Sequence, residues 1–463
     1  MTQNNKFFDC VKKEWLKIKP NIETLFKEQW DDPELPGMEI KSYSRLANWL
    51  EENNFQVTHS PYNIPTAFIA DSDPKVKGPT ICILAEYDAL PGLSLKNSPE
   101  KHYKNAGHGC GHNHIGPANV GAAIAAANAC KFLKIPGNIK VVGCPAEEIL
   151  WGKIALFNYG AFSNIDCILT SHGDYQNGSI SRPCQSVVSG ELVFEGQSGH
   201  GGNLHENNAL NAAEKTIFKV ESELQKEFPN ILFRHVIRQA GLIPTITPEE
   251  CRVWYTTRGF DFIETQNAYE QIIATGKEVS SGLNIKFHQQ FISETKGYLP
   301  NDTIGKKLFE SLKLVGPPKW TSDDIKYMNK LVQKIAPGKK MSLDKDIQYY
   351  DENEDYFGQD DGEVSWRIPL GRINWAYPME IPIHHWAWTE LSGNKASNPG
   401  PLMASEAIAL TSIHLLNNSE IIKIAKEELR LKTQNIKITK PKLGAFKTIT
   451  TNPKSFWDGT WQE

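Results

Sequence analysis

Short apolar segments alternate with helix-like segments in the first part of the chain. Residues 79–85, 139–144 and 167–170 are brief continuous apolar runs, which are typical of strands buried on both faces of a sheet. Between them lie an alanine-rich segment at 119–133 and a segment at 149–159, and both favour helix. This alternation predicts an α/β domain with a mostly parallel sheet and helices on both faces.

The pattern changes in the middle of the chain. Residues 189–195 and 252–258 alternate polar and apolar side chains, as expected of strands with one face in water. Long helix-like segments lie in the same block, which at about 110 residues is large enough for a small α+β domain. We therefore predict a domain at 186–297 that is inserted into a larger domain made of residues 1–185 and 298–463.

Composition excludes several classes of function. The 54 acidic and 50 basic residues give a net charge of −4, which argues against a nucleic-acid-binding protein because phosphate neutralisation needs a basic face. No apolar run approaches the roughly 20 residues that span a bilayer, and no secretory signal is visible. The eight cysteines show no regular spacing and no Cys-x-x-Cys, which is typical of reduced thiols. We expect a cytoplasmic protein that binds neither nucleic acid nor membrane.

Four short segments carry side chains that suit zinc, manganese or related ions. They contain Cys110 and His112 in a glycine-rich loop, the pair Glu147 and Glu148, His172, and the pair His384 and His385. The first three segments lie beside predicted helix or strand ends. Ligands of an open parallel sheet bind outside the carboxyl ends of its strands, so these segments can converge at one edge. Each segment alone has an ordinary structural explanation, but their joint placement favours a metal site.

The chemistry of these residue types gives them different roles. A bound cation favours the thiolate of Cys110, because it lowers the pKa of the thiol. Two adjacent glutamates are unsuited to one task, so one can coordinate while the other takes a proton from a water activated by the metal. The residues alone leave open whether Glu147 or Glu148 coordinates.

The motifs also occur in an order that resembles a known family. The order is LAEYDALPG at 84–92, HGCGHN at 108–113, PAEE at 145–148, SHG at 171–173 and SGHGG at 198–202. It resembles the co-catalytic metallopeptidases and amidohydrolases related to aminoacylase and carboxypeptidase G. The branch that includes aminobenzoyl-glutamate utilisation protein B and the hippurate- and auxin-conjugate hydrolases is the most similar. The resemblance covers the chain up to about Leu416.

The resemblance implies a catalytic domain with two divalent metal ions, zinc or manganese, and an inserted lid domain that forms a homodimer. Position by position, it implies five metal ligands: Cys110, His112, Glu148, His172 and His384. It implies that Glu147 is the general base. It also implies that Asp88 orients one of the metal ligands without binding the metal itself. The neighbouring His385 leaves the last ligand ambiguous by one position.

Two lid residues complete the implied site. The resemblance implies that His200 reaches the scissile carbonyl and that Arg258 binds the substrate carboxylate, which suits a bidentate guanidinium. The sequence also departs from the branch, because Thr245 stands where an asparagine is common. Threonine is shorter than asparagine and lacks its amide donor, so the substrate end of the lid differs from that of the branch.

We therefore expect a homodimeric metal-dependent hydrolase. Its substrate would be a small-molecule amide, either an N-acyl or N-aroyl amino acid similar to aminobenzoyl-glutamate or a short dipeptide. Zinc nucleoside deaminases also use Cys, His and a Glu base, but their His-x-Glu and Pro-Cys-x-x-Cys signatures are absent. A catalytically degenerate relative that only binds a ligand is the other alternative. The retained Glu147 argues against it, since a binding protein needs no base.

Overall fold

A computed structural model describes residues 3–95, 105–202 and 208–462. The chain divides into two compact units. Unit 1 comprises Met1–Arg182, Leu299–Asn353 and Val364–Thr439, and unit 2 comprises Pro183–Tyr298, Glu354–Glu363 and Lys440–Glu463. All eight cysteines are unpaired thiols. Among the helices of the described residues, none combines the length and apolarity needed to cross a membrane.

Unit 1 is built on an eight-stranded sheet in the order β1-β2-β4-β3-β5-β14-β6-β13. The strands are β1 (Gln56–His59), β2 (Phe68–Asp71), β3 (Thr80–Glu86), β4 (Asn138–Cys144), β5 (Cys167–Asp174), β6 (Gly178–Ile180), β13 (Gln348–Tyr350) and β14 (Leu370–Ala376). Strands β4, β3, β5 and β14 at the centre are parallel, whereas β1, β2 and the β14–β6 pair are antiparallel. The predicted α/β class with a mostly parallel sheet is confirmed.

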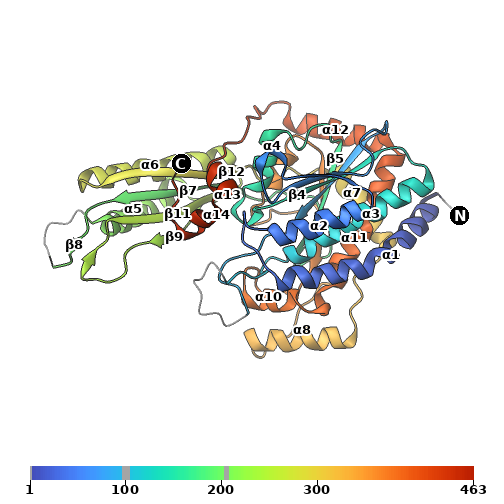
Figure 1. The fold of residues 1–463 in the computed structure, drawn as a ribbon, viewed down its shortest axis with the longest axis horizontal. Helices are drawn as coiled ribbons and strands as arrows, with labels where there is room; N and C mark the ends of the chain where they lie inside the picture. The colour runs from blue at the N-terminus through green and yellow to red at the C-terminus, as the bar shows by residue number, and fades with distance from the viewer. Residues whose placement is uncertain (1–2, 96–104, 203–207, 463) are drawn as a thin grey trace. The chain divides into compact units, whose positions relative to one another are not determined.

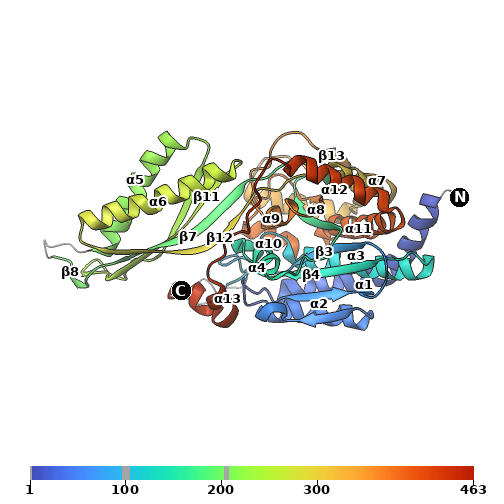
Figure 2. The ribbon, with the colours of Figure 1, turned by 90° about the horizontal axis from the view of Figure 1, so that it is seen from above.

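Helices cover both faces of this sheet (Figures 1 and 2). They are α1 (Gln3–Asp31), α2 (Ile40–Glu52), α3 (His112–Leu133), α4 (Gly152–Tyr159), α7 (Asp302–Val315), α8 (Ser322–Ile335), α10 (Trp386–Ser392), α11 (Pro399–Asn417) and α12 (Ser419–Thr433). The short helix α9 (Asp361–Ser365) has residues in both units. The alanine-rich helix α3 begins seven residues earlier than its composition predicts. It starts directly after Gly111, whose φ of +84° favours glycine. His112 is therefore the first residue of a buried helix.

Unit 2 is an α+β domain with a four-stranded antiparallel sheet. Its strands are β12 (Lys286–Thr295), β7 (Ser186–Glu195), β11 (Glu250–Gly259) and β9 (Leu232–Gln239), in that order. Helices α5 (Ala209–Glu227) and α6 (Phe262–Gly282) pack on one face, around core residues such as Leu192, Val253 and Tyr255. A separate pair joins β8 (Gly199–His200) to β10 (Ile246–Thr247).

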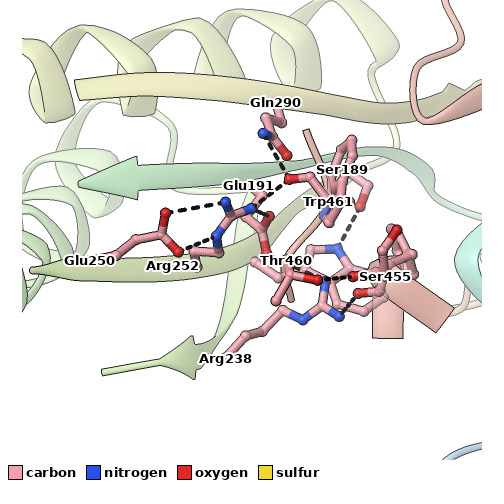
Figure 3. Close-up of polar contacts among 11 residues, drawn as sticks. Ser189, Glu191, Arg238, Glu250, Arg252, Gln290, Ser455, Thr460 and Trp461 are labelled. Atoms are coloured by element: carbon pink, nitrogen blue, oxygen red, sulfur yellow. Dashed lines mark hydrogen bonds and ion pairs between the residues drawn. The ribbon is translucent and has the colours of Figure 1, made fainter. Parts of the chain in front are cut away.

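The end of the chain packs on the other face of this sheet. Side chains alternate along a strand, so Glu191 and Arg252 point away from the helices. The tail carries α13 (Phe446–Thr451) and α14 (Pro453–Asp458), and its Trp461 carbonyl accepts hydrogen bonds from Arg252 at 2.8 Å and Gln290 at 3.1 Å (Figure 3). Glu191, fully buried, pairs with Arg252 at 3.2 Å and with Arg238 at 3.3 Å.

The structure therefore differs from the predicted domain division in two further segments, besides shifts of three residues or fewer at the boundaries of the inserted block. The prediction assigned residues 354–363 and 440–463 to the larger domain, but both segments belong to unit 2. The alternating pattern of residues 189–195 predicted that one face of β7 is exposed to solvent, but the tail covers that face. In the other segment, Glu363 forms a buried ion pair with Lys296 of β12 at 3.1 Å.

Candidate metal centre

The carboxyl ends of β3, β4 and β5 bring the candidate ligands of unit 1 together. Three groups of side chains have ligand atoms that all lie within 4.8 Å of one another. They are Cys110 with His112 and His172, Cys110 with Glu148 and His384, and Glu86 with His112 and Glu147. Because the groups share members, they form one continuous cluster at the strand ends, where an open α/β sheet binds its ligands.

His112 is oriented by a buried carboxylate. Its Nδ1 lies 2.9 Å from Oδ1 of Asp88, and both side chains are almost fully buried. The other oxygen of Asp88 accepts a hydrogen bond from the Glu148 backbone N–H at 2.9 Å. Nε2 of His112 is buried and has no hydrogen-bond partner among the described residues. This is the arrangement of a metal-ligating histidine, with one nitrogen held by a carboxylate and the other directed at the ion.

Cys110 and His172 meet on the same side of the cluster. Sγ of Cys110 lies 3.5 Å from Nε2 of His172, whose Nδ1 lies 2.7 Å from the Gly173 carbonyl. Burial raises the pKa of the Cys110 thiol, and burial raises the pKa of Glu148 to about 8. These groups need a nearby cation to be ionised at neutral pH, since burial without one favours their protonated forms. The donor set of thiolate, imidazole and carboxylate fits a divalent transition metal.

The adjacent histidines His384 and His385 have different environments. His384 Nε2 lies 3.5 Å from Oε2 of Glu148, and its backbone N–H donates to the Gly109 carbonyl at 2.9 Å. His385 instead caps α10, because its Nδ1 accepts a hydrogen bond from the Ala387 N–H at 3.2 Å. Of these two histidines, only His384 lies in the cluster that the candidate ligands form within the described residues.

Glu86 belongs to the cluster, and the sequence analysis did not identify it. Its Oε2 lies 3.8 Å from His112 Nε2, and its Oε1 lies 2.7 Å from the buried ammonium of Lys153 in α4. Burial alone would raise the pKa of Glu86, but Lys153 and then the two histidines hold it at about 2. The available signal was its position, since Glu86 is the last residue of β3 and therefore lies at the carboxyl end of that strand.

The implied lid residues lie in unit 2. His200 is exposed in the short strand β8, where it pairs with Ile246. Arg258 is half-buried near the end of β11. Thr245, the departure from the branch, accepts a hydrogen bond from the Gly201 N–H at 2.9 Å through its carbonyl. The contacts of His200 and Arg258 with a substrate stay predictions.

Two histidines that flank the ligand loop are packed away from the cluster. His108 contacts the Gln29 carbonyl at 3.1 Å, and His114 contacts Tyr377 and Ser397, each at 3.2 Å. Burial lowers the pKa of each histidine from 6.5 to about 3. Both are therefore neutral core residues at pH 7.

These neutral histidines predict an acid-sensitive fold. Below pH 6.5 the unfolded chain binds protons at these positions and the folded chain does not, down to about pH 3. Each histidine should therefore cost about 1.4 kcal/mol of stability per pH unit as the pH falls through that window. Urea unfolding of the wild type and of His114→Gln at several pH values measures this. The variant should lose less stability on acidification, and identical pH slopes would contradict the assignment.

Comparisons with known proteins show what the chain is similar to. No family model matches the chain. The chain is 26% identical to one of the subunits of the p-aminobenzoyl-glutamate hydrolase of Escherichia coli, over 86% of this chain and 90% of that protein. It is 25% identical to the mouse Xaa-Arg dipeptidase, over 88% of each.

Solved structures have the same fold. A dinuclear metal-binding peptidase from Bacillus subtilis matches with a TM-score of 0.56 and 18% identity, over 86% of this chain and 98% of that one. An aminobenzoyl-glutamate utilization protein from Klebsiella pneumoniae matches with a TM-score of 0.58 and 13% identity, over 87% of this chain and 98% of that one. These neighbours support the α/β fold of the chain over most of its length.

Proposed function

We propose that this chain, which belongs to the family of metal-dependent peptidases and amidohydrolases, cleaves the amide bond of an N-acyl or N-aroyl amino acid or of a short dipeptide. The observation that carries the proposal is the cluster at the strand ends, in which Cys, His and carboxylate ligand atoms lie close together and the buried Glu147 lies beside His112. The relatives that are named for aminobenzoyl-glutamate and for dipeptides support this substrate class.

The donor set can hold two divalent ions. The five side chains that would hold them are Cys110, His112, Glu148, His172 and His384. Zinc or manganese bound there would polarise the amide carbonyl and acidify a water molecule. A thiolate ligand favours zinc, while the carboxylates also suit manganese.

Glu147 supplies the acid–base chemistry in this proposal. The residue is only 5% exposed, and its carboxylate lies 3.7 Å from Nε2 of His112, so it reaches the space beside the ligands. It follows Ala146, whose φ of +56° turns the chain sharply after β4. Adjacent residues on this turn can therefore divide the work: Glu148 binds the ion, and Glu147 takes the proton of the attacking water and passes it to the leaving amine.

The lid supplies substrate contacts in this proposal. Arg258 would bind the carboxylate of the amino-acid part, since a guanidinium matches a carboxylate with two parallel hydrogen bonds. His200 would donate to the oxygen of the carbonyl as negative charge develops there. Loss of one such donor typically costs about 3 kcal/mol of transition-state stabilisation.

Amine release from a substrate panel tests the proposed activity. The panel comprises aminobenzoyl-glutamate, hippurate, N-acetyl amino acids and β-alanyl dipeptides, each with added manganese or zinc and each with a chelator. We expect release that depends on the metal and that identifies the preferred acyl group. Metal-loaded protein that binds a panel member without releasing amine would instead support the ligand-binding alternative.

We also propose that the protein is a homodimer that pairs through unit 2. Strand β9 forms an edge of the four-stranded sheet, and its Leu232, Val236 and Ile237 are exposed apolar side chains. An exposed apolar edge strand is a template for pairing with a second copy.

This arrangement predicts the effect of charge on β9. The double substitution Leu232→Lys and Val236→Lys should weaken the dimer by about tenfold or more, because like charges would face each other across the paired strands. Ile263→Lys, which changes an even more exposed apolar residue of α6, is the control and should leave the dimer intact. Sedimentation at micromolar concentration measures both, and a monomeric wild type would contradict the proposal.

A further inference from the structure

A groove of about 450 Å³ lies in unit 1, away from the candidate ligands. It is bounded by α1, by the start of α11 and by the proline-containing segment that joins α7 to α8. Trp15, Leu402 and Met403 form an apolar wall, and each of them is more than 90% buried. The Trp15 indole N–H is held by Ser405 Oγ at 3.1 Å, so the wall has a fixed shape.

A buried carboxylate lies in this groove. Glu406 of α11 lines it and is only 7% exposed. Its Oε1 is buried without a hydrogen-bond partner, and no described residue forms an ion pair with it. Burial raises the pKa of Glu406, while Lys12, Lys19 and Lys319 lower it. A buried carboxylate without hydrogen bonds is costly, and it therefore indicates a group whose partner comes from outside the chain.

The rest of the groove carries charges of both signs, because Glu23 and Asp324 line it together with lysines. Four lysines line it: Lys12, Lys19, Lys319 and Lys395. Within the described residues, none of them forms an ion pair. Lys12 and Lys319 are exposed, so this charge faces solvent at the rim while that of Glu406 lies deeper. Asp324 already accepts hydrogen bonds from the backbone N–H and the hydroxyl of Thr321. The four lysines therefore outnumber the two remaining carboxylates, the buried Glu406 and the half-buried Glu23.

We propose that this groove binds a zwitterionic α-amino acid with an apolar side chain. The ammonium group pairs with Glu406, the carboxylate faces the lysine rim, and the side chain packs on Trp15 and Met403. A simple cation is disfavoured by the four lysines, and a simple anion is disfavoured by Glu406. Binding in this groove does not depend on the proposed hydrolytic activity. If that activity holds, the ligand belongs to the class of product that hydrolysis releases, and the groove is a second site for it.

Calorimetric titration of L-leucine into the full-length protein tests this site. Leucine should bind the wild type, and Glu406→Gln should weaken that binding by about tenfold or more, as expected when a charge-assisted hydrogen bond is lost. Lys319→Met should weaken it by about two- to fivefold, because its ion pair is exposed. Glu420→Gln, which removes an exposed carboxylate of α12, is the matched control and should bind as the wild type does.

Two analogues of leucine test the charge requirement. 3-Methylbutylamine lacks the carboxylate and 4-methylpentanoate lacks the amine, so both should bind much more weakly than leucine. Equal binding by either analogue would overturn the zwitterion class. Equal leucine binding by the wild type and Glu406→Gln, or no leucine binding at all, would overturn the site. Glu406→Gln should melt no lower than the wild type, because it removes an unpartnered buried charge. A lower melting temperature would indicate a structural role and contradict the proposal.

Discussion

Glu147→Gln should lower kcat by about 10²–10⁴-fold while the metal content stays at the wild-type level. Removal of a general base has an effect of this size because the proton of the reacting water loses its positioned acceptor. Glutamine keeps the size of the side chain and its buried position, so the fold and the ligands are retained. Turnover of the best panel substrate and metal analysis of the same sample measure the two quantities together.

Glu148→Gln is the matched variant for this experiment. It makes the same chemical change one residue later, in a side chain whose Oε1 is buried without a hydrogen-bond partner and whose Oε2 lies 3.5 Å from His384. It should lose metal as well as activity, because an amide is a much poorer ligand than a carboxylate. Wild-type turnover by Glu147→Gln would contradict the division of roles. Normal metal content in Glu148→Gln would contradict the assignment of Glu148 as a metal ligand.

Glu191→Met should destabilise unit 2 by about 3–5 kcal/mol, the usual cost of breaking a buried ion pair from one side. Glu191 is fully buried and contacts both Arg238 and Arg252, so its loss removes a buried carboxylate from two guanidinium groups and leaves Arg252 with Glu250 alone (Figure 3). The tail should also loosen, because Arg252 and Arg238 hold the carbonyls of Trp461 and Phe456. Urea unfolding followed by tryptophan fluorescence reports this change, since Trp254 and Trp461 lie at the network.

A second glutamate on the same strand provides the control. Glu195 pairs with Lys286 at 2.7 Å, but Lys286 is largely exposed. Glu195→Gln should therefore change the stability by less than about 1 kcal/mol, as is usual for surface ion pairs. Equal effects of Glu191→Met and Glu195→Gln would show that burial of the network contributes little.

The sequence predicts the central sheet because its signals are local. Continuous apolar runs identify β3 and β4, and alanine content identifies most of α3. The ligand cluster was also predictable, since parallel strands deliver their carboxyl ends to one edge wherever the loops lie in sequence.

Features that depend on distant partners were not predictable. The burial of Glu191 requires a tail whose Trp461 lies 270 positions later, and no periodicity reports such a pairing. Glu86 depends on Lys153 in the same way. The choice of His384 over His385 depends on the start of α10, because a cap and a ligand are indistinguishable by residue type alone.

Metal add-back to chelator-treated protein is the most direct test of the central claim. Hydrolysis of the best panel substrate would be followed while manganese or zinc is added in fractions of an equivalent. The account predicts negligible turnover without metal and a rise that saturates at about two ions per chain. Full turnover in the metal-free protein, or saturation with metal without any hydrolysis, would contradict it.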